Sequence, residues 1–455
     1  MLEIQVTAHQ PLALGIRPVG TAPAPTRLYI PGSVLRGALA AAWIADYGLP
    51  TKVPADQRRE FIALFEGDVS YGPLFATGSQ VVPLSVLRCK YRTCVTVVDE
   101  AFNNTEGEPR CACGPLVPGR GEVEFTKSAA RGLVTQSTHL QIDDARGVAE
   151  ESLLFTRRAL THRDAEGAER TFHGCITPGS ELPDRAAGWL AGARRLRLGG
   201  RRGTSGAVTY TPRPAVAVPP ATGRRVALRL TAPTILTDPS GLPLDLADHQ
   251  SVQAALDDEL APLLGGARVI AVERVWARRE RVGGWHAASR LPKPVELAIS
   301  AGSVLVLGFG QPPDPDGLVT LMGRGIGLRR NEGFGALETA TTAWEQPLEP
   351  AASTATDQDQ DQAPDAEAYA HRLFDTGHGA WFIDNLRPYV QELAARPDAR
   401  HIGLLERPRL RRLAPDEREV LTTMLLYAPV EVLDHTLGIL AVLVRGLMEK
   451  ETLRP

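Results

Sequence analysis

Two glycine-rich segments, 199–208 and 323–337, each contain adjacent arginines, a combination suited to binding phosphate. Glycine tolerates a positive φ and lets the backbone approach a ligand closely. Successive backbone N–H groups in such a loop form a concavity that attracts anions, and a guanidinium adds paired donors for phosphate oxygens. The arginines are Arg201 and Arg202 in the first segment, and Arg324, Arg329 and Arg330 in the second. We therefore expect these loops to bind a phosphate backbone.

The two loops also resemble each other, which predicts an internal repeat. Both contain Gly-x-Arg-Arg, a short polar gap, and then Gly-Ala followed by an apolar residue. The strand pattern Ile4–Ala8 likewise resembles Leu228–Ala232, so the two halves are predicted to be divergent repeats. A nucleotide-binding enzyme is disfavoured, because no Gly-Lys-Ser/Thr follows and residues 335–338 predict a strand, not the helix that a dinucleotide fingerprint needs. The other alternative is a pair of glycine-rich turns that bind nothing.

Four of the five cysteines lie in a segment rich in glycine and proline, which has no core of its own. They are Cys89, Cys94, Cys111 and Cys113. Two pairs of thiolates suit a tetrahedral zinc ion, and a metal would explain how such a segment folds. We therefore predict structural zinc, although the spacing of the two pairs is loose. The alternative is four reduced thiols, and Cys175, which stands apart, is expected to pack against apolar side chains.

Further candidates combine histidine with carboxylates or with an aromatic ring. His139 precedes Asp143 and Asp144 closely, an arrangement that general acid–base cleavage of RNA could use. We prefer a structural role for this segment and assign no catalytic residue. Trp285 and His286 are expected to contact RNA, because an indole can stack on an unpaired base, which contributes about 1–3 kcal/mol. A buried tryptophan that anchors its loop is the alternative.

Local patterns predict the elements that position these residues. Alternation of apolar and polar residues predicts a strand over 2–8, and Ser33 is expected to cap a helix that ends before Gly48. Arg36 lies in the first turn of that helix, where free N–H groups favour an anion. The alternative is that Ser33 only caps the helix and that Arg36 is solvated.

The composition is that of an ordinary folded protein, with 43% hydrophobic residues, 23% charged residues and a net charge of −3. A length of 455 residues predicts two or three domains. Lysine is rare among the 50 basic residues, which suits phosphate binding by guanidinium groups or reflects codon bias. Few cysteines argue against a disulfide framework, and the chain has no predicted signal peptide or membrane-spanning run, so we expect a cytoplasmic protein.

Several motifs together resemble the RAMP superfamily of CRISPR-associated proteins. The second loop, 325–335, is similar to the glycine-rich loop of that family, and Tyr29–Gly37 resembles its Ile-Pro-Gly-Ser-x-Leu-Arg-Gly entrance to a helix. Leu64–Val69 resembles a Leu-Phe-Gly turn of the family but departs from it at Glu66. Segments at 284–286, 291–294 and 301–304 resemble the two-RAMP-domain subunit of type III-D effector complexes. The resemblance covers about residues 1–345.

The resemblance implies an α+β fold with two tandem ferredoxin-like (RRM-like) domains, a zinc-knuckle-like insertion and a C-terminal helical domain. The implied boundaries are 1–215 for the first RAMP domain with its cysteine-rich insertion at about 86–122, 224–345 for the second, 346–367 for an acidic linker and 368–455 for the helical domain.

The resemblance also implies a function, namely a non-catalytic RNA-binding subunit of a type III CRISPR effector complex in antiviral defence. Such a subunit holds the 5′ handle of the guide RNA and contacts the large cyclase-bearing subunit and the backbone RAMP subunits. The expected RNA-binding residues are Ser33, Arg36, Arg201, Arg202, Trp285, His286, Arg324, Arg329 and Arg330. The alternative is an endoribonuclease that uses His139 and Asp143.

Overall fold

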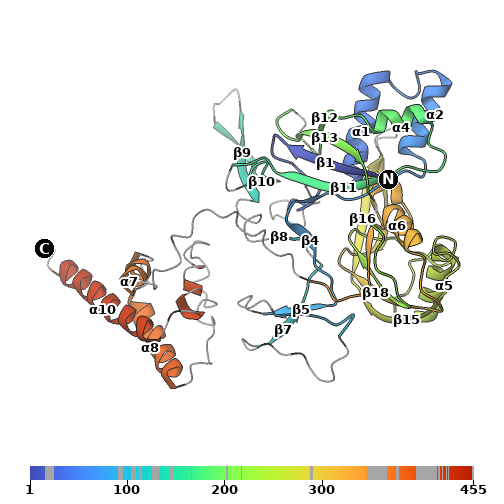
Figure 1. Cartoon of the computed structure of the whole chain (residues 1–455). Coiled ribbons are helices and arrows are strands. Elements are labelled where there is room, and N and C mark those ends of the chain that lie inside the picture. The colour runs from blue at the N-terminus through green and yellow to red at the C-terminus, as the bar shows by residue number, and fades with distance from the viewer. Residues whose placement is uncertain are drawn as a thin grey trace. The chain divides into compact units, whose positions relative to one another are not determined.

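The fold is described from a computed structural model of the chain (Figure 1). The described residues are 1–15, 25–90, 96–103, 109, 111, 115–121, 123–125, 133–143, 148–164, 167–200, 203–216, 218–286, 291–345, 366–375, 379–395, 418, 421–422, 424–426, 428 and 430–452.

The first half is built on an antiparallel sheet with the order β12-β13-β1-β11-β2. The strands are β1 (Leu2–Ala8), β2 (Ser70–Tyr71), β11 (Thr171–Thr177), β12 (Arg194–Arg197) and β13 (Ala207–Pro214), and β3 (Phe75–Ala76) also pairs with β11. The helices are α1 (Gly32–Tyr47), α2 (Ala55–Phe65) and α4 (Asp184–Leu190). Ile4 and Val6 are fully buried against Leu39 and Trp43 of α1, so the predicted alternation of β1 points its apolar face toward the helices.

Helix α1 begins two residues earlier than the sequence pattern predicts. Its N-cap residue is Pro31, with φ −61° and ψ 145°, and no side chain caps the helix. Ser33 is therefore not the N-cap, and its side chain is exposed in the first turn. The extended conformation of Pro31 already orients the chain for the helix, which replaces the expected serine cap.

The second half has the chain order strand, helix, two strands, helix, strand. Its elements are β14 (Arg225–Leu230), α5 (His249–Leu260), β15 (Val269–Trp276), β18 (Val304–Phe309), α6 (Pro315–Arg324) and β19 (Leu337–Ala340). The sheet order is β15-β18-β14-β19, so the first strand lies between the third and the fourth. The first half has the same order, with β1, β2, β11 and β13 in the four positions and β12 added at the edge beside β13.

The two sheets differ on the face that points away from the helices. In the second sheet, Ala227, Val304 and Val306 on this face are buried under Ala101 and Phe102. In the first sheet, the corresponding face of β1 carries Gln5 and Thr7, followed by His9 just after the strand, and all three are half-buried. The second sheet is therefore covered on both faces, whereas the first presents polar side chains on one.

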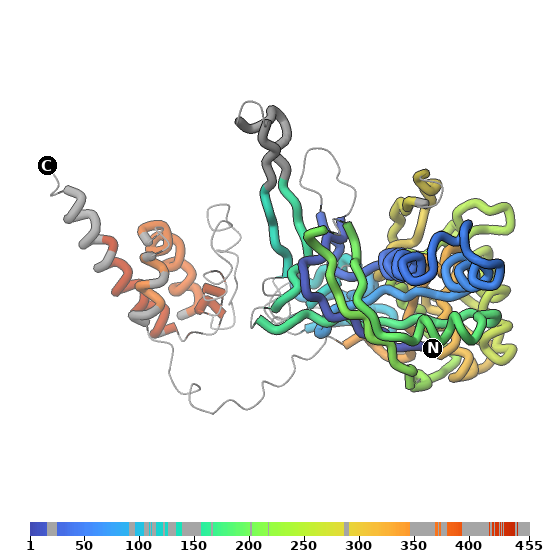
Figure 2. Tube along the Cα trace, turned by 90° about the horizontal axis from the view of Figure 1, so that it is seen from above, coloured from blue at the N-terminus to red at the C-terminus, as the bar shows by residue number. Residues whose placement is uncertain are grey.

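Two hairpins extend from these sheets. One consists of β9 (Val134–Asp143) and β10 (Val148–Leu160), teal in Figure 2, and the other of β16 (Arg279–His286) and β17 (Leu291–Ile299), yellow in Figure 2. Shorter strands are β4 (Ser79–Val81) and β8 (Val123–Phe125), which pair, and β5 (Val86–Cys89), β6 (Val97–Asp99) and β7 (Leu116–Pro118). A single 3₁₀ turn, η1 (Arg330–Glu332), lies in the second glycine-rich loop.

The C-terminal region contains the helices α7 (Ala366–Asp375), α8 (Gly379–Ala395) and α10 (Val430–Thr452). Their buried residues, including Leu373, Leu386, Leu433 and Leu440, form a hydrophobic core of their own. The chain divides into two compact units, one of residues 1–87, 98–105 and 118–350 and the other of residues 88–97, 106–117 and 351–455. No helix in the described part of the chain is both long and apolar enough to cross a membrane.

Candidate nucleic-acid interface

The two glycine-rich loops occupy equivalent places in the two halves and share their backbone hydrogen bonds. In each loop, an apolar residue that precedes the Gly-x-Arg-Arg motif donates to the last glycine, which in turn donates to the proline after the first strand. The donor–acceptor pairs are Leu198–Gly206 at 2.8 Å and Ile326–Gly335 at 3.0 Å, then Gly206–Pro11 at 3.0 Å and Gly335–Pro233 at 2.9 Å. The internal repeat predicted from the sequence is thus confirmed at the level of the backbone.

The same hydrogen bonds correct the predicted alignment of the first strands. The N–H of His9 donates to Ala207 O and that of Thr231 donates to Ala336 O, both at 2.9 Å. His9 therefore corresponds to Thr231, and Ala8 corresponds to Leu230 instead of Ala232. The prediction was wrong by two residues, because a shift of two preserves which face each side chain occupies.

The last glycine of each loop is required by the backbone conformation and by the close packing around it. Gly206 and Gly335 have φ values of 85° and 77°, a region that side chains rarely adopt. A Cβ atom would lie 2.1 Å from Leu198 O in the first loop and 1.8 Å from Ile326 O in the second. Glycine at these positions therefore allows the loop to close, whether or not the loop binds a ligand.

The second loop packs against the start of helix α1, so that two motifs about 300 positions apart in the chain meet. A Cβ atom on Gly32 would lie 1.9 Å from Tyr71 O and 2.8 Å from the Cα of Gly333. Two hydroxyl groups of the first half also donate to the end of α6, Thr177 Oγ1 to Gly323 O at 2.7 Å and Ser70 Oγ to Arg324 O at 3.1 Å. The glycines of both motifs thus allow close contact between the two halves.

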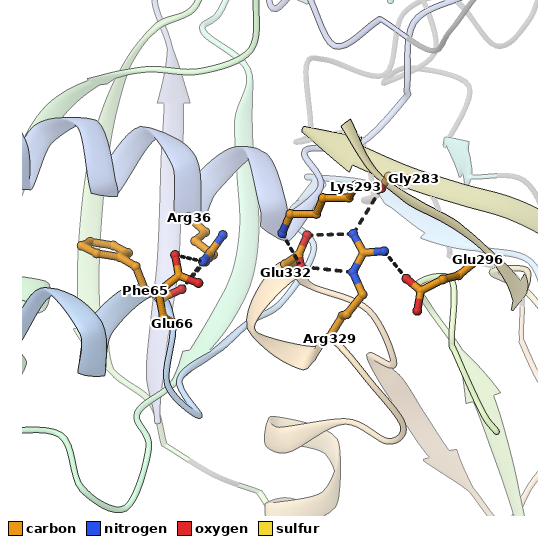
Figure 3. Close-up of polar contacts among 8 residues, drawn as sticks. All are labelled: Arg36, Phe65, Glu66, Gly283, Lys293, Glu296, Arg329 and Glu332. Carbon is orange, nitrogen blue, oxygen red and sulfur yellow. Dashed lines mark hydrogen bonds and ion pairs between the residues drawn. The ribbon is translucent and has the colours of Figure 1, made fainter. Parts of the chain in front are cut away.

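Arg329 is the one non-glycine residue with positive φ in the described part of the chain, at 57°. Its guanidinium contacts Glu332 through Nε at 3.1 Å and through Nη2 at 2.9 Å, and contacts Glu296 through Nη1 at 2.5 Å (Figure 3). Nη2 also donates to Gly283 O at 3.2 Å. The guanidinium therefore connects the second loop to both strands of the β16–β17 hairpin.

A second cation reaches the same carboxylate. Lys293 of β17 contacts Glu332 at 2.7 Å, and the side chains of Lys293 and Glu332 are 19% and 11% exposed (Figure 3). Burial raises the pKa of Glu332, but hydrogen bonds from Arg329 and Lys293 outweigh burial and lower it below the ordinary value. Burial alone would lower the pKa of Arg329, but its bonds to Glu332 and Glu296 raise it. Arg329 and Glu332 are therefore held in their charged forms.

The neighbouring arginines differ from Arg329. Arg330 contacts Glu259 at 3.1 Å, and burial together with the nearby Arg324 lowers its pKa. The same carboxylate accepts the N–H of Gly327 at 2.8 Å. Arg324 is half-buried and has no carboxylate partner among the described residues. Of the three arginines of this loop, Arg324 is thus the one not already neutralised by a carboxylate, and the roles of Arg329 and Arg330 in phosphate binding stay predictions.

Arg36 is occupied by contacts within the first half. Its Nε donates to Phe65 O at 2.6 Å and its Nη2 contacts Glu66 at 2.9 Å (Figure 3). Phe65 is the last residue of α2, so the guanidinium satisfies a carbonyl that the helix leaves free. Glu66, the departure from the family turn, supplies the carboxylate that holds Arg36. Arg36 therefore ties the start of α1 to the end of α2.

The other predicted site residues fall into two groups. Trp285 lies on β16 and is 62% exposed, so the alternative of a buried anchor is wrong. Arg201, Arg202, Cys94 and Cys113 lie outside the described residues, as do the side chains of His139, Asp143 and His286. Their predicted roles are therefore untested.

The cysteine segment shows thiols of the right chemistry but not the whole predicted site. Cys89 is buried and Cys111 is half-buried, and neither is in a disulfide. Thiols in such places could become zinc ligands. No group of three or more His, Cys, Asp or Glu side chains is placed to hold a metal ion within the described ranges, which contain two of the four cysteines. Structural zinc stays a prediction.

One residue of functional interest was missed by the sequence patterns. The side chain of Asp99 is fully buried and pairs with Arg229 at 2.9 Å. It also accepts hydrogen bonds from Ser85 Oγ at 2.6 Å and from the N–H of Trp344 at 2.9 Å. The residue fastens the end of β6 to the second sheet, and no local pattern around it signals this role.

The comparisons with known proteins give distant likenesses only. No protein-family model and no curated protein matches the chain. One solved structure, a type III-B Cmr-beta complex bound to cognate target RNA, has a chain with 11% identity and a TM-score of 0.37, over 67% of this chain and 86% of that one. A CRISPR-associated Cas6 protein has 11% identity and a TM-score of 0.29, over 74% and 98%. Oligomeric Cmr4 from Pyrococcus furiosus has 11% identity and a TM-score of 0.22, over 48% and 98%. At such TM-scores these likenesses decide neither the fold nor the function of this chain.

Proposed function

We propose that this protein is an RNA-binding, non-catalytic subunit of a type III CRISPR effector complex and that it has two tandem ferredoxin-like RAMP domains. The observation that carries the proposal is the pair of equivalent loops, which share their hydrogen bonds and lead into the last strand of each half. The strand order of both halves is that expected of a ferredoxin-like fold, with the first strand between the third and the fourth. The motif resemblances in the sequence supply the family.

The RNA ligand we propose is the 5′ handle of the guide RNA. The second loop and the start of α1 meet, so backbone N–H groups of a helix N-terminus and a loop with an unneutralised Arg324 lie in the same region. Both features attract phosphate groups. Arg201 and Arg202 of the first loop are proposed to contact the same strand of RNA, whereas Arg329 and Arg330 would have to exchange a carboxylate for a phosphate.

Trp285 gives the proposal a base-binding component. The indole is 62% exposed at the end of β16, on the hairpin that Arg329 and Lys293 attach to the second loop. An exposed indole on a fixed strand can stack on an unpaired base. We propose that Arg329 acts on RNA binding by positioning this hairpin, and that the large cyclase-bearing subunit and backbone RAMP subunits are the protein partners.

The test is incubation of the purified protein with labelled repeat RNA, with retention and cleavage scored together. We expect retention without cleavage, with an affinity that falls as salt rises because phosphate contacts release counterions. Arg324→Glu and Trp285→Ala should weaken retention, and Arg58→Glu on the exposed side of α2 serves as the charge-matched control.

Two results would overturn the proposal. Cleavage that disappears in His139→Ala or Asp143→Ala would identify an endoribonuclease instead. If a variant that carries Arg324→Glu and lacks the side chains of Arg201 and Arg202 retains RNA as well as the native protein, the two loops are not part of the RNA interface. A metal assay on the same sample, with Cys111→Ser as the control, tests the zinc component separately.

A further inference from the structure

A groove that plays no part in the proposed RNA interface lies beside β12, the edge strand of the first sheet. Its volume is about 590 Å³, and it is lined by Ala38, Ala41 and Ala42 of α1, by Arg195, Leu196 and Arg197 of β12, and by the adjoining His9, Ala207 and Val208. Strand β12 is the last strand of this sheet, so one of its sides has no neighbouring strand among the described residues. The groove is therefore bounded by helix α1, by strand β12, whose outer edge is open, and by the adjoining start of β13.

The register shows which backbone groups of β12 point away from the sheet at this open edge. Leu198 N donates to Gly206 O at 2.8 Å, which identifies the pairs bonded between β12 and β13 as every second residue, including Leu196 with Val208. Arg195 and Arg197 are the alternate residues, so their N–H and C=O groups project away from β13. No described residue satisfies them. Two donors and two acceptors are thus available in the spacing of a β-strand.

The two walls of the groove have different chemistry. Leu196 faces the helices and is buried beside α1, where Ala38, Ala41 and Ala42 leave room because their side chains are small. Arg195 and Arg197 are exposed on the opposite face of the strand. Arg197 donates to Gln10 Oε1 at 2.8 Å, a neutral partner, and Arg195 has no ion-pair partner among the described residues. Neither positive charge is neutralised.

We propose that β12 binds an extended segment of a partner protein as an additional strand, and that this segment has the pattern acidic–apolar–acidic. Backbone pairing with an exposed sheet edge is a general mode of peptide recognition, with alternate side chains supplying specificity. The residues opposite Arg195 and Arg197 would place carboxylates beside the two guanidinium groups. The residue between them would point to the other face, against the alanines of α1.

The apolar wall favours a peptide over RNA as the occupant. An RNA strand would use the two arginines but would leave the alanine surface and the four backbone groups without partners. Charged side chains on an edge strand can also serve only to prevent aggregation. A free strand edge alone fits both protection against aggregation and peptide binding. A groove beside that edge, with apolar alanines on one side and arginines on the other, favours peptide binding.

The test uses fluorescence anisotropy with the full-length protein. The probe is a fluorescein-labelled peptide, Gly-Ser-Glu-Val-Glu-Val-Glu-Val-Ser-Gly, and the control peptide has the same composition with its three glutamates adjacent and its three valines adjacent. We expect saturable binding of the alternating peptide and binding at least tenfold weaker of the control. Arg195→Glu combined with Arg197→Glu should abolish binding, while Arg58→Glu with Arg59→Glu on exposed positions of α2 should preserve it.

A second pair of variants tests the backbone contact. Arg197→Ala removes one charge, and Arg197→Pro removes the same charge together with the outward N–H, a substitution that an edge strand tolerates. Loss of one hydrogen bond predicts binding about fivefold weaker for the proline than for the alanine variant. Each variant is compared by thermal midpoint with the native protein, so that unfolding is recognised.

Three outcomes would overturn the proposal. They are no saturable binding of the alternating peptide, equal binding of both peptides, and equal binding by Arg197→Ala and Arg197→Pro. A labelled RNA oligonucleotide is run in parallel. If RNA binding depends on Arg195 and Arg197 and peptide binding does not, the groove is part of the RNA interface instead. Because repeat-RNA retention is measured separately with Arg324→Glu, the two proposals fail independently.

Discussion

Replacement of Arg329 by alanine should release the β16–β17 hairpin from the second loop. The guanidinium makes three charged hydrogen bonds to Glu332 and Glu296 and one to Gly283 O. The side chains of Arg329 and Glu332 are 15% and 11% exposed, so their contact resembles a buried ion pair more than a surface one. Loss of one partner of a buried pair costs about 3–5 kcal/mol, whereas exposed pairs contribute less than about 1 kcal/mol.

Two features lower this estimate. Lys293 remains at 2.7 Å from Glu332, so that carboxylate keeps a cation, and Glu296 is 33% exposed and can be solvated. We therefore expect the hairpin to be destabilised by about 2–4 kcal/mol. At about 1.4 kcal/mol for each tenfold change, opening of the hairpin becomes about 30- to 700-fold more frequent.

Hydrogen exchange measured by mass spectrometry tests this directly. Amides of 279–286 and 291–299 should exchange faster in Arg329→Ala, while those of β1 and β13 in the first sheet should not change. Arg281→Ala is the matched control, because Arg281 is exposed on the same strand and has no ion-pair partner among the described residues. Equal exchange in Arg329→Ala and Arg281→Ala would refute a structural role for the Arg329 contacts.

Three further predictions follow from single contacts. Gly335→Ala should lower stability by at least about 1–3 kcal/mol in thermal unfolding, since the added Cβ would lie 1.8 Å from Ile326 O. The control Gly37→Ala should be neutral or slightly stabilising, because a Cβ there meets no atom within 4 Å, and equal effects of the two substitutions would contradict this prediction. Glu332→Gln should reduce the loss of folding stability between about pH 5 and pH 3. The pKa of Glu332 is lowered in the folded protein, so its contribution to stability is present above the unfolded-state pKa and is lost as the pH falls through the folded-state pKa. An unchanged dependence of stability on pH would contradict the lowered pKa. Asp99→Ala should cost about 3–5 kcal/mol because it leaves Arg229, whose side chain is 12% exposed, without its carboxylate, and a loss below about 1 kcal/mol in urea unfolding would contradict that.

The repeat and its loops could be predicted from the sequence because glycine is required where a side chain cannot fit. Gly206 and Gly335 close their loops through the same contact in both halves, so a glycine is found at this place in both loops although the second loop is one residue longer. The alignment of the first strands could not be predicted to the residue. Alternation with a period of two gives the same facing for Ala8 opposite Leu230 or Ala232, and only the hydrogen bonds of His9 and Thr231 distinguish the two.

The partners of the arginines were beyond local patterns. Arg329 and Glu332 are neighbours, but Lys293 lies 39 positions before Glu332 on a hairpin whose register the sequence does not specify. Arg36 finds Phe65 O and Glu66 only because α1 and α2 pack together. An arginine pattern predicts a cation, and the tertiary structure decides whether that cation is free for phosphate or already paired with a carboxylate.

The contact between Gly32 and Gly333 requires the backbone surfaces of the two halves to be closely complementary. Backbone lies against backbone there, with Cα of one glycine 2.7–2.8 Å from where the Cβ of the other would be, and no side chain intervenes that could adjust its rotamer. A chain cut in the stretch between β13 and β14 would therefore yield two fragments with complementary rigid surfaces. Such fragments, produced separately and mixed, should reassemble as one particle, and a methyl group added at either glycine should prevent the reunion.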